Sequence, residues 1–384
     1  MPEHLPARVV AALRALPRPV CAYVYDLAAL RERAAAVRAA LPPGTTLLYA
    51  VKANGHPDVV RTLAGVCDGL EVASGGELEL AVAAGARRIV FAGPAKTPAE
   101  LAAAVAAGAQ INVESALELH RLDAIGAPVE VAIRVNRAGV SLPGSHAMTG
   151  TPTPFGVDER ELPEVLALAA RLPHIRVVGF HLHAVSNNLD AAAHAAFIAD
   201  ALAWARRQDV DLRLVNVGGG FGVDHTGTAT LDLAGLGRLL GRLLPRPDGV
   251  ELIVEPGRIL AADAGWYAAE VLDLKRVHGR WFAVLRGGTH HFRLPAAWGY
   301  SHPFTVLPVD DWPHPWPRPE VTGAEVDVAG ELCTPRDVLA RGAAVDRLRV
   351  GDALVFGRTG AYGWDISHHD FLRHPHPQVI TLAG

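Results

Sequence analysis

Lysine is almost missing from this 384-residue chain. Only three of its 36 basic residues are lysine, namely Lys52, Lys96 and Lys275, and arginine supplies the rest. Because arginine already provides positive charge for solubility, a lysine in an apolar setting needs a chemical explanation. Lys52 ends the apolar run of residues 47–51, where burying an ammonium group is costly. Either its stem carries the amine out to water, or the amine forms a Schiff base with an aldehyde cofactor, which arginine cannot do.

Other absences exclude whole classes of protein. Cys21, Cys67 and Cys333 are an odd, scattered set without metal-type spacing, so we expect a reducing cytoplasm and no disulfide framework. The net charge is −4 and no polybasic stripe occurs, so we expect neither a nucleic acid nor a membrane as partner. No uncharged apolar run reaches the roughly 18 residues of a membrane helix. Residues 1–4 (MPEH) lack the order of a signal peptide.

Short β-rich runs alternate with Ala/Leu-rich helical stretches between about residues 46 and 260. Such alternation is typical of β–α–β units and a parallel sheet, and eight repeats favour a (β/α)8 barrel over an open sheet. The predicted strands are 46–53, 69–74, 88–93, 110–115, 129–136, 175–183, 211–217 and 251–256, with helices such as 97–108 and 190–208 between them. The loop of residues 137–157 after the fifth strand is long enough to suggest a function or disorder.

The sequence changes character after about residue 265, where tryptophan, proline, glycine and short β-rich runs replace the helical pattern. These runs predict a C-terminal all-β domain, which the strand of residues 22–25 could join. We therefore predict an α/β protein with a barrel domain over 27–265 and a β domain made of 1–26 and 266–384. The β-rich runs are 281–285, 325–328 and 353–356.

Polar residues follow the carboxyl ends of the predicted strands, which is the face of a barrel where active sites lie. Three consecutive glycines, Gly218–Gly220, follow the seventh predicted strand, and their backbone amides can approach a phosphate because no side chains intervene. Barrels commonly bind phosphate in the loops after strands seven and eight. Arg258 can add a bidentate contact to the same anion. The residues at these ends are Lys52, Glu71, Ser74, Arg134, His183, Ser186, Gly218–Gly220, Glu255 and Arg258.

Glu255 gives the sharpest chemical clue among these residues. A carboxylate beside a pyridine nitrogen keeps that nitrogen protonated and makes the ring an electron sink, whereas the alternative is an ordinary ion pair with Arg258. His181 and His183 share one face of a strand and could form a metal pair. No third ligand has suitable spacing, so we predict no metal. We expect His183 to lie flat on a cofactor ring and His181 to pack behind it.

Seven motifs in this order resemble the fold-type III pyridoxal-phosphate decarboxylases, the group that contains diaminopimelate, ornithine and arginine decarboxylases. They are YAVKAN at 49–54, EVASGGEL at 71–78, HLH at 181–183, GGGF at 218–221, EPGR at 255–258, GELC at 330–333 and GAYG at 360–363. The resemblance covers essentially the whole chain. It implies pyridoxal 5'-phosphate as cofactor, carboxy-lyase activity, and an obligate head-to-tail homodimer whose β domain completes the neighbouring active site.

The resemblance also implies a role for each matching residue. Lys52 would form the Schiff base, Glu255 would hold the pyridine nitrogen, and Cys333 would reach across the dimer interface as an acid or positioning group. Racemases with this cofactor fold have an arginine facing the pyridine nitrogen. Because this chain has Glu255 there, racemisation is disfavoured. The residues implied around the cofactor are Lys52, Glu71, Arg134, His183, Ser186, Gly218, Gly219, Gly220, Glu255, Gly257, Arg258 and Tyr362.

Departures from the family pattern narrow the substrate. Val185 stands where the family has glycine near the phosphate, which leaves the path of that loop open. Thr334 follows Cys333 where diaminopimelate and ornithine enzymes have an acid, so a cationic distal amine is disfavoured. Three further stretches resemble the siderophore-biosynthesis branch, whose substrates are citryl-diaminopropionate-type conjugates. These stretches are 148–156, 287–295 and 367–371.

We therefore predict decarboxylation of an α-amino acid group on a carboxylate-rich siderophore precursor. The residues expected to hold such a polyanion are Arg293, His290, His291, Thr334 and His368, although the histidine pairs could also be solvent-facing loop residues. One alternative function is meso-diaminopimelate decarboxylation in lysine biosynthesis. Another is a non-catalytic regulatory homologue that binds pyridoxal phosphate, which the retention of Lys52, Cys333 and the β domain argues against.

Overall fold

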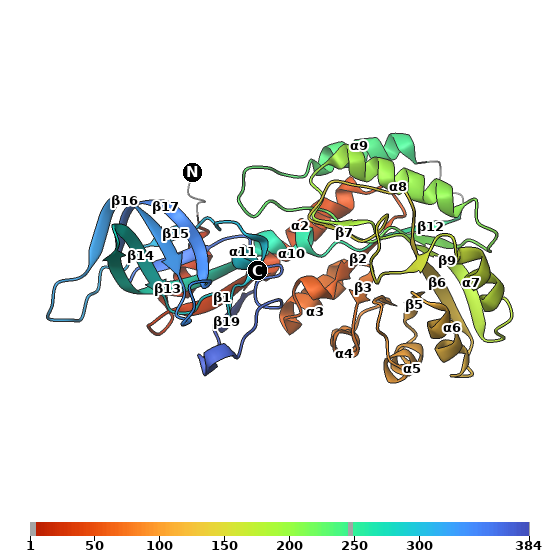
Figure 1. The fold of residues 1–384 in the computed structure, drawn as a ribbon, viewed down its shortest axis with the longest axis horizontal. Coiled ribbons are helices and arrows are strands. Elements are labelled where there is room, and N and C mark those ends of the chain that lie inside the picture. The colour runs from red at the N-terminus through yellow and green to blue at the C-terminus, as the bar shows by residue number, and fades with distance from the viewer. Residues whose placement is uncertain (1–4, 245–248, 384) are drawn as a thin grey trace. The chain divides into compact units, whose positions relative to one another are not determined.

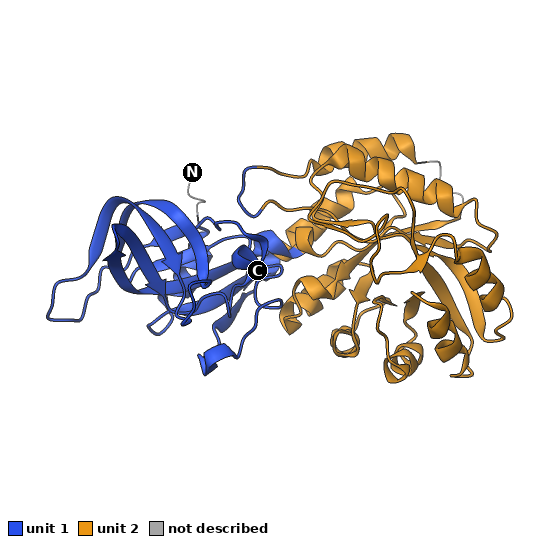
Figure 2. Ribbon diagram, viewed as in Figure 1, with its two compact units in different colours: residues 1–29, 225–228, 261–384 blue, residues 30–224, 229–260 orange. Residues whose placement is uncertain are grey.

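The computed structural model describes residues 5–244 and 249–383, which form two compact units (Figures 1 and 2). Unit 1 comprises the described residues within 1–29, 225–228 and 261–384, and unit 2 comprises those within 30–224 and 229–260. Residues 1–4, on which the signal-peptide expectation rests, lie outside the described residues. The domain boundaries expected from the sequence stay predictions.

Unit 2 is a closed parallel barrel of eight strands flanked by helices (Figure 1), which confirms the (β/α)8 prediction. The ring closes because β12 pairs with β2 and β5 pairs with β6. The barrel strands, in order around the ring, are β2 (Thr46–Ala50), β3 (Gly69–Val72), β4 (Ile89–Phe91), β5 (Gln110–Val113), β6 (Val129–Asn136), β9 (Ile175–His181), β11 (Leu214–Asn216) and β12 (Glu251–Val254). The predicted strands run a few residues too long, and Lys52 lies in the 3-10 turn η1 (Val51–Ala53) rather than in a strand.

Helices and three minor strands complete this part of the chain. The helices are α2 (Leu27–Ala40), α3 (Pro57–Val66), α4 (Gly75–Ala83), α5 (Pro98–Ala106), α6 (Ala116–Asp123), α7 (Leu162–Ala169), α8 (Ala191–Ala205), α9 (Leu233–Leu243) and α10 (Arg258–Ala261). The minor strands are β7 (His146–Ala147), β8 (Val157–Asp158) and β10 (Val185–Ser186). The long loop expected at 137–157 therefore contains β7 and ends at β8. None of the described helices is long and apolar enough to cross a membrane.

Several helices of unit 2 begin at residues whose side chains accept from free backbone N–H groups. Thr97 accepts from the N–H of Glu100, and Glu100 reaches back to the N–H of Thr97, so a capping box begins α5. Ser74 accepts from the N–H of Glu77 at 3.2 Å and caps α4. The hydroxyl of Ser74, which the sequence places at the barrel rim, is thus used to start a helix.

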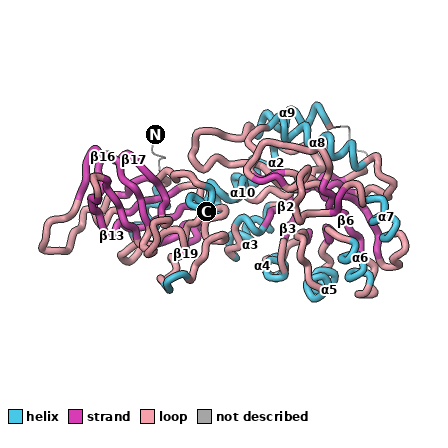
Figure 3. Tube along the Cα trace, in the orientation of Figure 1, coloured by secondary structure: helices cyan, strands magenta, loops and turns pink. Residues whose placement is uncertain are grey.

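Unit 1 is built on an eight-stranded, mostly antiparallel sheet (Figure 3), which confirms the predicted all-β region. The N-terminal strand β1 (Cys21–Asp26) joins it, pairing with β13 and β19 as the sequence suggests. Its other strands are β13 (Gly265–Val277), β14 (Arg280–Leu285), β15 (Thr305–Leu307), β16 (Glu320–Ala329), β17 (Val338–Arg349), β18 (Ala353–Phe356) and β19 (Gln378–Leu382). The helical segments are α1 (Ala7–Arg14), η2 (Ala262–Ala264), α11 (Leu294–Trp298) and η3 (Phe371–Arg373).

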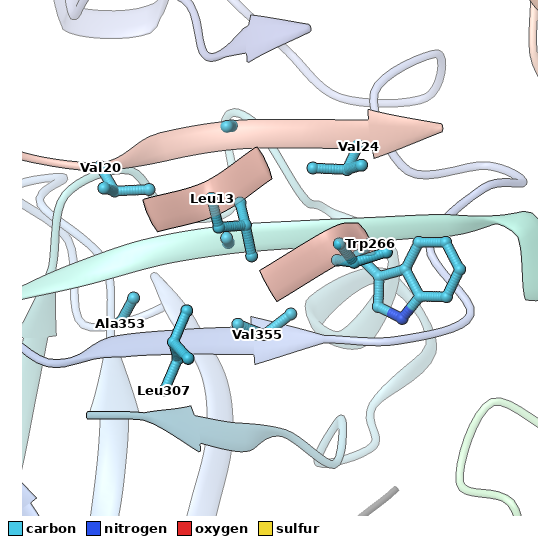
Figure 4. Packing of buried hydrophobic residues seen from close by; sticks show 10 residues of the cluster. Leu13, Val20, Val24, Trp266, Leu307, Ala353 and Val355 are labelled. Atoms are coloured by element: carbon cyan, nitrogen blue, oxygen red, sulfur yellow. The ribbon is translucent and has the colours of Figure 1, made fainter. Parts of the chain in front are cut away.

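Each unit has its own apolar core. In the barrel, six strands each contribute one buried residue to a cluster of Leu48, Val90, Ala132, Val178, Leu214 and Ile253. In unit 1, Leu13 of α1 packs against Val24 of β1 and Val355 of β18 (Figure 4), which ties the N-terminal helix to a strand more than 300 residues away in the sequence. Burying a side chain of this size contributes about 1.5–3 kcal/mol. These contacts pack the strands of each unit against one another.

Two buried histidines make the fold sensitive to acid. Burial lowers the pKa of His194 and of His302 from 6.5 to about 4 in each case. His302 Nε2 donates to the carbonyl of Gly357 at 2.8 Å, and its Nδ1 lies 2.9 Å from the hydroxyl of Tyr300. A histidine with a lowered pKa is neutral in the folded state, whereas the unfolded chain binds its proton below pH 6.5. Stability contributed by these neutral rings is therefore lost as the pH falls from 6.5 towards 4.

We expect the free energy of unfolding to fall by about 2 kcal/mol per histidine between pH 7 and pH 5. His302→Gln, which can keep the bond to Gly357 but cannot titrate, should flatten this dependence in thermal or urea unfolding. His278→Asn in the exposed turn between β13 and β14 is the control and should keep the wild-type slope. Equal pH slopes for wild type and His302→Gln would contradict the assignment.

Candidate active site

The amine of Lys52 meets a buried carboxylate at the rim of the barrel. Lys52 lies in η1 directly after β2, and its Nζ makes a short ion pair with Glu71 Oε2 on the neighbouring strand β3. The side chain of Lys52 is 44% exposed, whereas that of Glu71 is 3% exposed. Burial raises the pKa of Glu71, and the nearby Glu255 raises it further, against the opposing effect of Lys52. A carboxylate with a raised pKa beside an amine can exchange a proton with it.

Glu255 is the second buried carboxylate of this rim and follows β12. Asn216 Nδ2 donates to its Oε1 at 2.5 Å, and His181 Nε2 lies 3.5 Å from its Oε2. Burial alone would raise the pKa of Glu255, but the charges of His181 and Lys52 and the hydrogen bond from Asn216 bring it down to about 2. Glu255 therefore remains an anion at neutral pH and can stabilise a cationic ring nitrogen.

Glycines 218 to 220 form a cradle that admits no side chain. Gly218 and Gly220 have φ angles of +69° and +91°, in the region that favours glycine. A Cβ on Gly219 would lie 2.5 Å from the carbonyl oxygen of Glu255, and one on Gly220 would lie 2.6 Å from that of Val185. Backbone packed this closely leaves no room for a side chain, so an anion such as a phosphate can approach the main chain itself; the N–H groups of Gly218 and Gly219 donate to Asn216 Oδ1 and His183 Nδ1.

Val185, the departure from the family pattern, fits beside this cradle. It lies in β10, which pairs with β7, and its side chain is buried. Gly144 gives it room, because a Cβ on Gly144 would collide with the Cγ2 atom of Val185. The branched side chain is thus accommodated by a glycine on the opposing loop.

His183 faces the cradle as a neutral ring. The N–H of Gly219 donates to His183 Nδ1 at 3.3 Å, which places any ring proton of the neutral form on Nε2. Burial lowers the pKa of His183 well below its usual value, and the positive charges of Arg134 and Lys52 lower it further. A neutral, fixed imidazole of this kind can cover the face of an aromatic cofactor.

Two residues that the sequence did not single out hold others in place. Glu114 accepts from Arg134 Nη1 and from the N–H of Gly93, each at 2.8 Å, and so fixes the arginine predicted near the cofactor. Arg134 also lies over the ring of Phe155 at 4.6 Å. Asn216, which binds Glu255, comes two residues before the glycine run. Both follow or end a barrel strand, and that position is the signal that could have found them.

The structure thus gathers only some of the predicted site residues within unit 2. Lys52 pairs with Glu71, the glycine cradle is hydrogen-bonded to His183 and to the backbone of Glu255, and Arg134 pairs with Glu114. Arg258 is 5% exposed at the start of α10. Ser186 lies in β10, and Gly257 closely approaches Ala53. The remaining predicted residues belong to unit 1, namely Tyr362, Cys333, Thr334, Arg293, His290, His291 and His368.

A buried aspartate organises the unit 1 residues. Asp337 is 1% exposed and accepts from the N–H of Thr289 at 2.6 Å and from the N–H of Leu332 at 2.8 Å. A Cβ on Gly288 or Gly330 would collide with this carboxylate, which explains the glycines of both motifs. Asp337 therefore ties the segment before Arg293 to the segment before Cys333.

A hollow of about 740 Å³ lies next to the segments that Asp337 joins, within unit 1. Arg293, Thr334 and His368, three of the predicted substrate residues, line it. His290 and His291 do not, because both are fully buried, so they are not solvent-facing loop residues either. His290 lies 3.5 Å from Glu331, which pairs with Arg286, and thus belongs to a charged layer inside the unit.

Comparison with known proteins agrees with this geometry. A family model described as the pyridoxal-binding domain of pyridoxal-dependent decarboxylases matches residues 27–262, more than half of the chain. The chain belongs to this family of decarboxylases. It is a lyase, and its cofactor is pyridoxal 5'-phosphate.

Individual relatives separate by substrate. The chain is 40% identical, over 98% of its length and 97% of the relative, to 2-[(L-alanin-3-ylcarbamoyl)methyl]-2-hydroxybutanedioate decarboxylase of Staphylococcus aureus. It is 34% identical to the diaminopimelate decarboxylase of Deinococcus radiodurans, over 88% of this chain and 84% of that one. The structure of Helicobacter pylori diaminopimelate decarboxylase complexed with L-lysine superposes with a TM-score of 0.84 at 25% identity, covering 97% of this chain and 93% of that one.

The residues present fit pyridoxal phosphate. The amine of Lys52 suits its aldehyde, the side-chain-free cradle suits its phosphate, and the ionised Glu255 suits its ring nitrogen. These assignments follow from the chemistry of the donors and stay predictions for each residue.

We expect His181 to keep Glu255 ionised. Neither ring nitrogen of His181 makes a hydrogen bond within the described part of the chain, so its effect on Glu255 at 3.5 Å is electrostatic. His181→Leu should remove that effect, raise the pKa of Glu255 and lower kcat about 10- to 100-fold. His181→Gln, which places a neutral but polar amide beside Glu255, should retain part of that activity.

The decisive readout is the ¹⁵N chemical shift of the ring nitrogen in protein loaded with ¹⁵N-labelled pyridoxal phosphate. We expect the shift to move towards the unprotonated value in His181→Leu and to move less far in His181→Gln. An identical shift in all three proteins would mean that His181 only fills space.

Asp337 should be essential to the fold of unit 1. Asp337→Asn replaces one acceptor oxygen by a donor amide facing backbone N–H groups, so we expect a loss of about 2 kcal/mol or more in the free energy of unfolding. The exposed Asp346→Asn on β17 is the matched control and should change it by less than about 0.5 kcal/mol. Urea unfolding checks both, and equal stabilities would refute the organising role.

Proposed function

We propose that the protein removes the α-carboxylate of an amino-acid group carried on a carboxylate-rich siderophore precursor, such as a citryl-diaminopropionate conjugate. The observation that carries this proposal is the match along almost the whole chain to the S. aureus enzyme. Its name describes a citrate-like hydroxy acid with two free carboxylates, joined through an amide to carbon 3 of alanine. The diaminopimelate decarboxylases are less similar to this chain.

The hollow in unit 1 supports a polyanionic substrate. Thr334 is neutral where the family resemblance leads us to expect an acid in enzymes that take a distal amine, and Arg293 and His368 line the same hollow as Thr334. Aspartate and glutamate are absent from the described residues that line it. A cationic distal amine would find no counter-charge there, whereas carboxylates would find an arginine.

The site residues divide the work of the reaction between them. Bound pyridoxal phosphate supplies the electron sink for the pair released when CO2 leaves. Glu255 would keep the ring nitrogen protonated, and the cradle of Gly218–Gly220 with Arg258 and Ser186 would hold the phosphate. His183 would cover one face of the ring. Glu71, with its raised pKa, would exchange a proton with the amine of Lys52.

The remaining predicted residues act from unit 1. We propose a homodimer in which Cys333 and Thr334 serve the partner's site and Tyr362 approaches the phosphate. Cys333 is exposed and free, as an acid or positioning group must be to reach a substrate. The buried His290 and His291 would support the hollow from behind. Free cysteines and a small-molecule biosynthetic reaction are consistent with a cytoplasmic location.

The test is CO2 release by protein loaded with pyridoxal phosphate, with the citryl-diaminopropionate conjugate and meso-diaminopimelate supplied side by side. We expect kcat/KM for the conjugate to be at least about 100-fold higher than for meso-diaminopimelate. The distal ammonium group of diaminopimelate would lie near arginine without a carboxylate to pair with it, and burying an unpaired charge costs several kcal/mol. Lys52→Ala should release CO2 from neither substrate. Turnover of diaminopimelate alone would replace the proposal with the lysine-pathway function.

A third result separates an enzyme from a regulatory homologue. If wild-type protein binds pyridoxal phosphate through Lys52 but releases no CO2 from either compound or from a panel of α-amino acids, the catalytic proposal fails. The cofactor assignment would then stand alone.

A further inference from the structure

The hollow in unit 1 carries more positive charge than the predicted substrate residues account for. Arg336 and Arg341 line it together with Arg293, and none of the described residues that line it is acidic. None of the three guanidinium groups has a hydrogen-bond or ion-pair partner among residues 5–244 and 249–383. By contrast, Arg347 on the same strand as Arg341 is paired with Glu320. Three such arginines around one hollow offer several charged donors to a carboxylate.

A short turn presents Arg336 to this hollow. The N–H of Asp337 donates to the carbonyl of Thr334 at 3.2 Å, which closes a four-residue turn with Pro335 at its second position. The hydroxyl of Thr334 accepts from the N–H of Arg336 at 3.3 Å. Since the buried carboxylate of Asp337 anchors the end of the turn, Arg336 stands on a fixed support although its side chain is exposed.

Arg341 comes from a second segment that lines the hollow, and this segment is also held by hydrogen bonds. Its backbone N–H donates to Ser301 Oγ at 2.9 Å, and the N–H of His302 donates to the carbonyl of Leu339 at 3.0 Å. These bonds fasten the chain that follows α11 to the start of β17. Since Arg293 directly precedes α11, all three arginines are mounted on segments joined by hydrogen bonds.

We propose that Arg336 and Arg341 bind the two carboxylates of the citryl group and so determine the substrate class of this enzyme. The inference rests on the proposed function and deepens it. Arginine suits this role because its planar fork binds a carboxylate through two parallel hydrogen bonds. Thr334 then contributes as the residue that shapes the turn, as well as by removing an acid.

The experiment compares two substrates that differ in those carboxylates. The first is the citryl-diaminopropionate conjugate, and the second is β-N-acetyl-2,3-diaminopropionate, which keeps the amino acid and the amide but lacks both citryl carboxylates. Arg336→Gln and Arg341→Gln should each raise KM for the conjugate about tenfold with little change in kcat, because the contact is equal in ground and transition states. Neither should change kcat/KM for the acetyl compound.

Arg347→Gln is the matched control, since it removes a charge from β17 outside the hollow. It should leave KM for the conjugate within about twofold of wild type. A direct binding measurement with citrate, by calorimetry on the full-length protein loaded with pyridoxal phosphate, should show affinity lost in Arg336→Gln and Arg341→Gln and kept in Arg347→Gln.

The outcomes distinguish this inference from the proposed function. Turnover of the conjugate with unchanged KM in both hollow variants would overturn the inference and leave the function intact. No turnover of the conjugate, with citrate binding that depends on Arg336 and Arg341, would overturn the function and support the site. If wild-type protein neither turns over the conjugate nor binds citrate, both fail.

Discussion

The barrel site depends on the cost of keeping two carboxylates, Glu71 and Glu255, buried beside each other at one rim. Two neighbouring buried carboxylates repel each other when both are ionised. Their surroundings therefore shift their pKa values in opposite directions, raising that of Glu71 and lowering that of Glu255. His181 and Asn216 stabilise the negative charge of Glu255, whereas Glu71 faces the one amine of the site. The result is one permanent anion and one group that can exchange protons, from two chemically similar side chains.

Unit 1 solves a similar problem differently. The carboxylate of Asp337 is buried as deeply as those of the barrel, but the partners shown for it are backbone N–H groups and its neighbours are glycines. Such an acid does no chemistry; it fixes where two segments of the chain run. The exposed residues Arg293, Cys333 and Arg336 therefore lie on segments whose backbone is held in place by hydrogen bonds to Asp337.

The fold could be predicted from the sequence because it depends on periodicity, which a single chain displays. The alternation of apolar runs and helices gave the eight barrel strands, and the change after residue 265 gave the sheet of unit 1. Strand ends were less visible: Lys52 lies in a 3-10 turn, because the chain must leave the sheet before its amine can turn towards Glu71. Ser74 looked like a rim residue and is a helix cap.

Long-range contacts were the part that the sequence could not display. Nothing near Glu255 in the sequence indicates that His181 and Asn216 meet it, since each arrives from a different strand. The sequence left open whether His290 and His291 hold the substrate or face solvent from a loop, whereas both are buried beside Glu331, Trp364 and other residues of unit 1. Arg336 gave no signal at all until the turn that carries it was seen beside the hollow.

The turn at residues 334–337 separates what must stay constant from what can vary. Its last residue is locked into the interior, while the two before it project outward and contribute little to the core. Substitutions at the exposed positions 335 and 336 can therefore change the charge near a ligand without destabilising the sheet of unit 1. Diversification of substrate preference in this scaffold would need only a few codons, all within one short stretch of the gene.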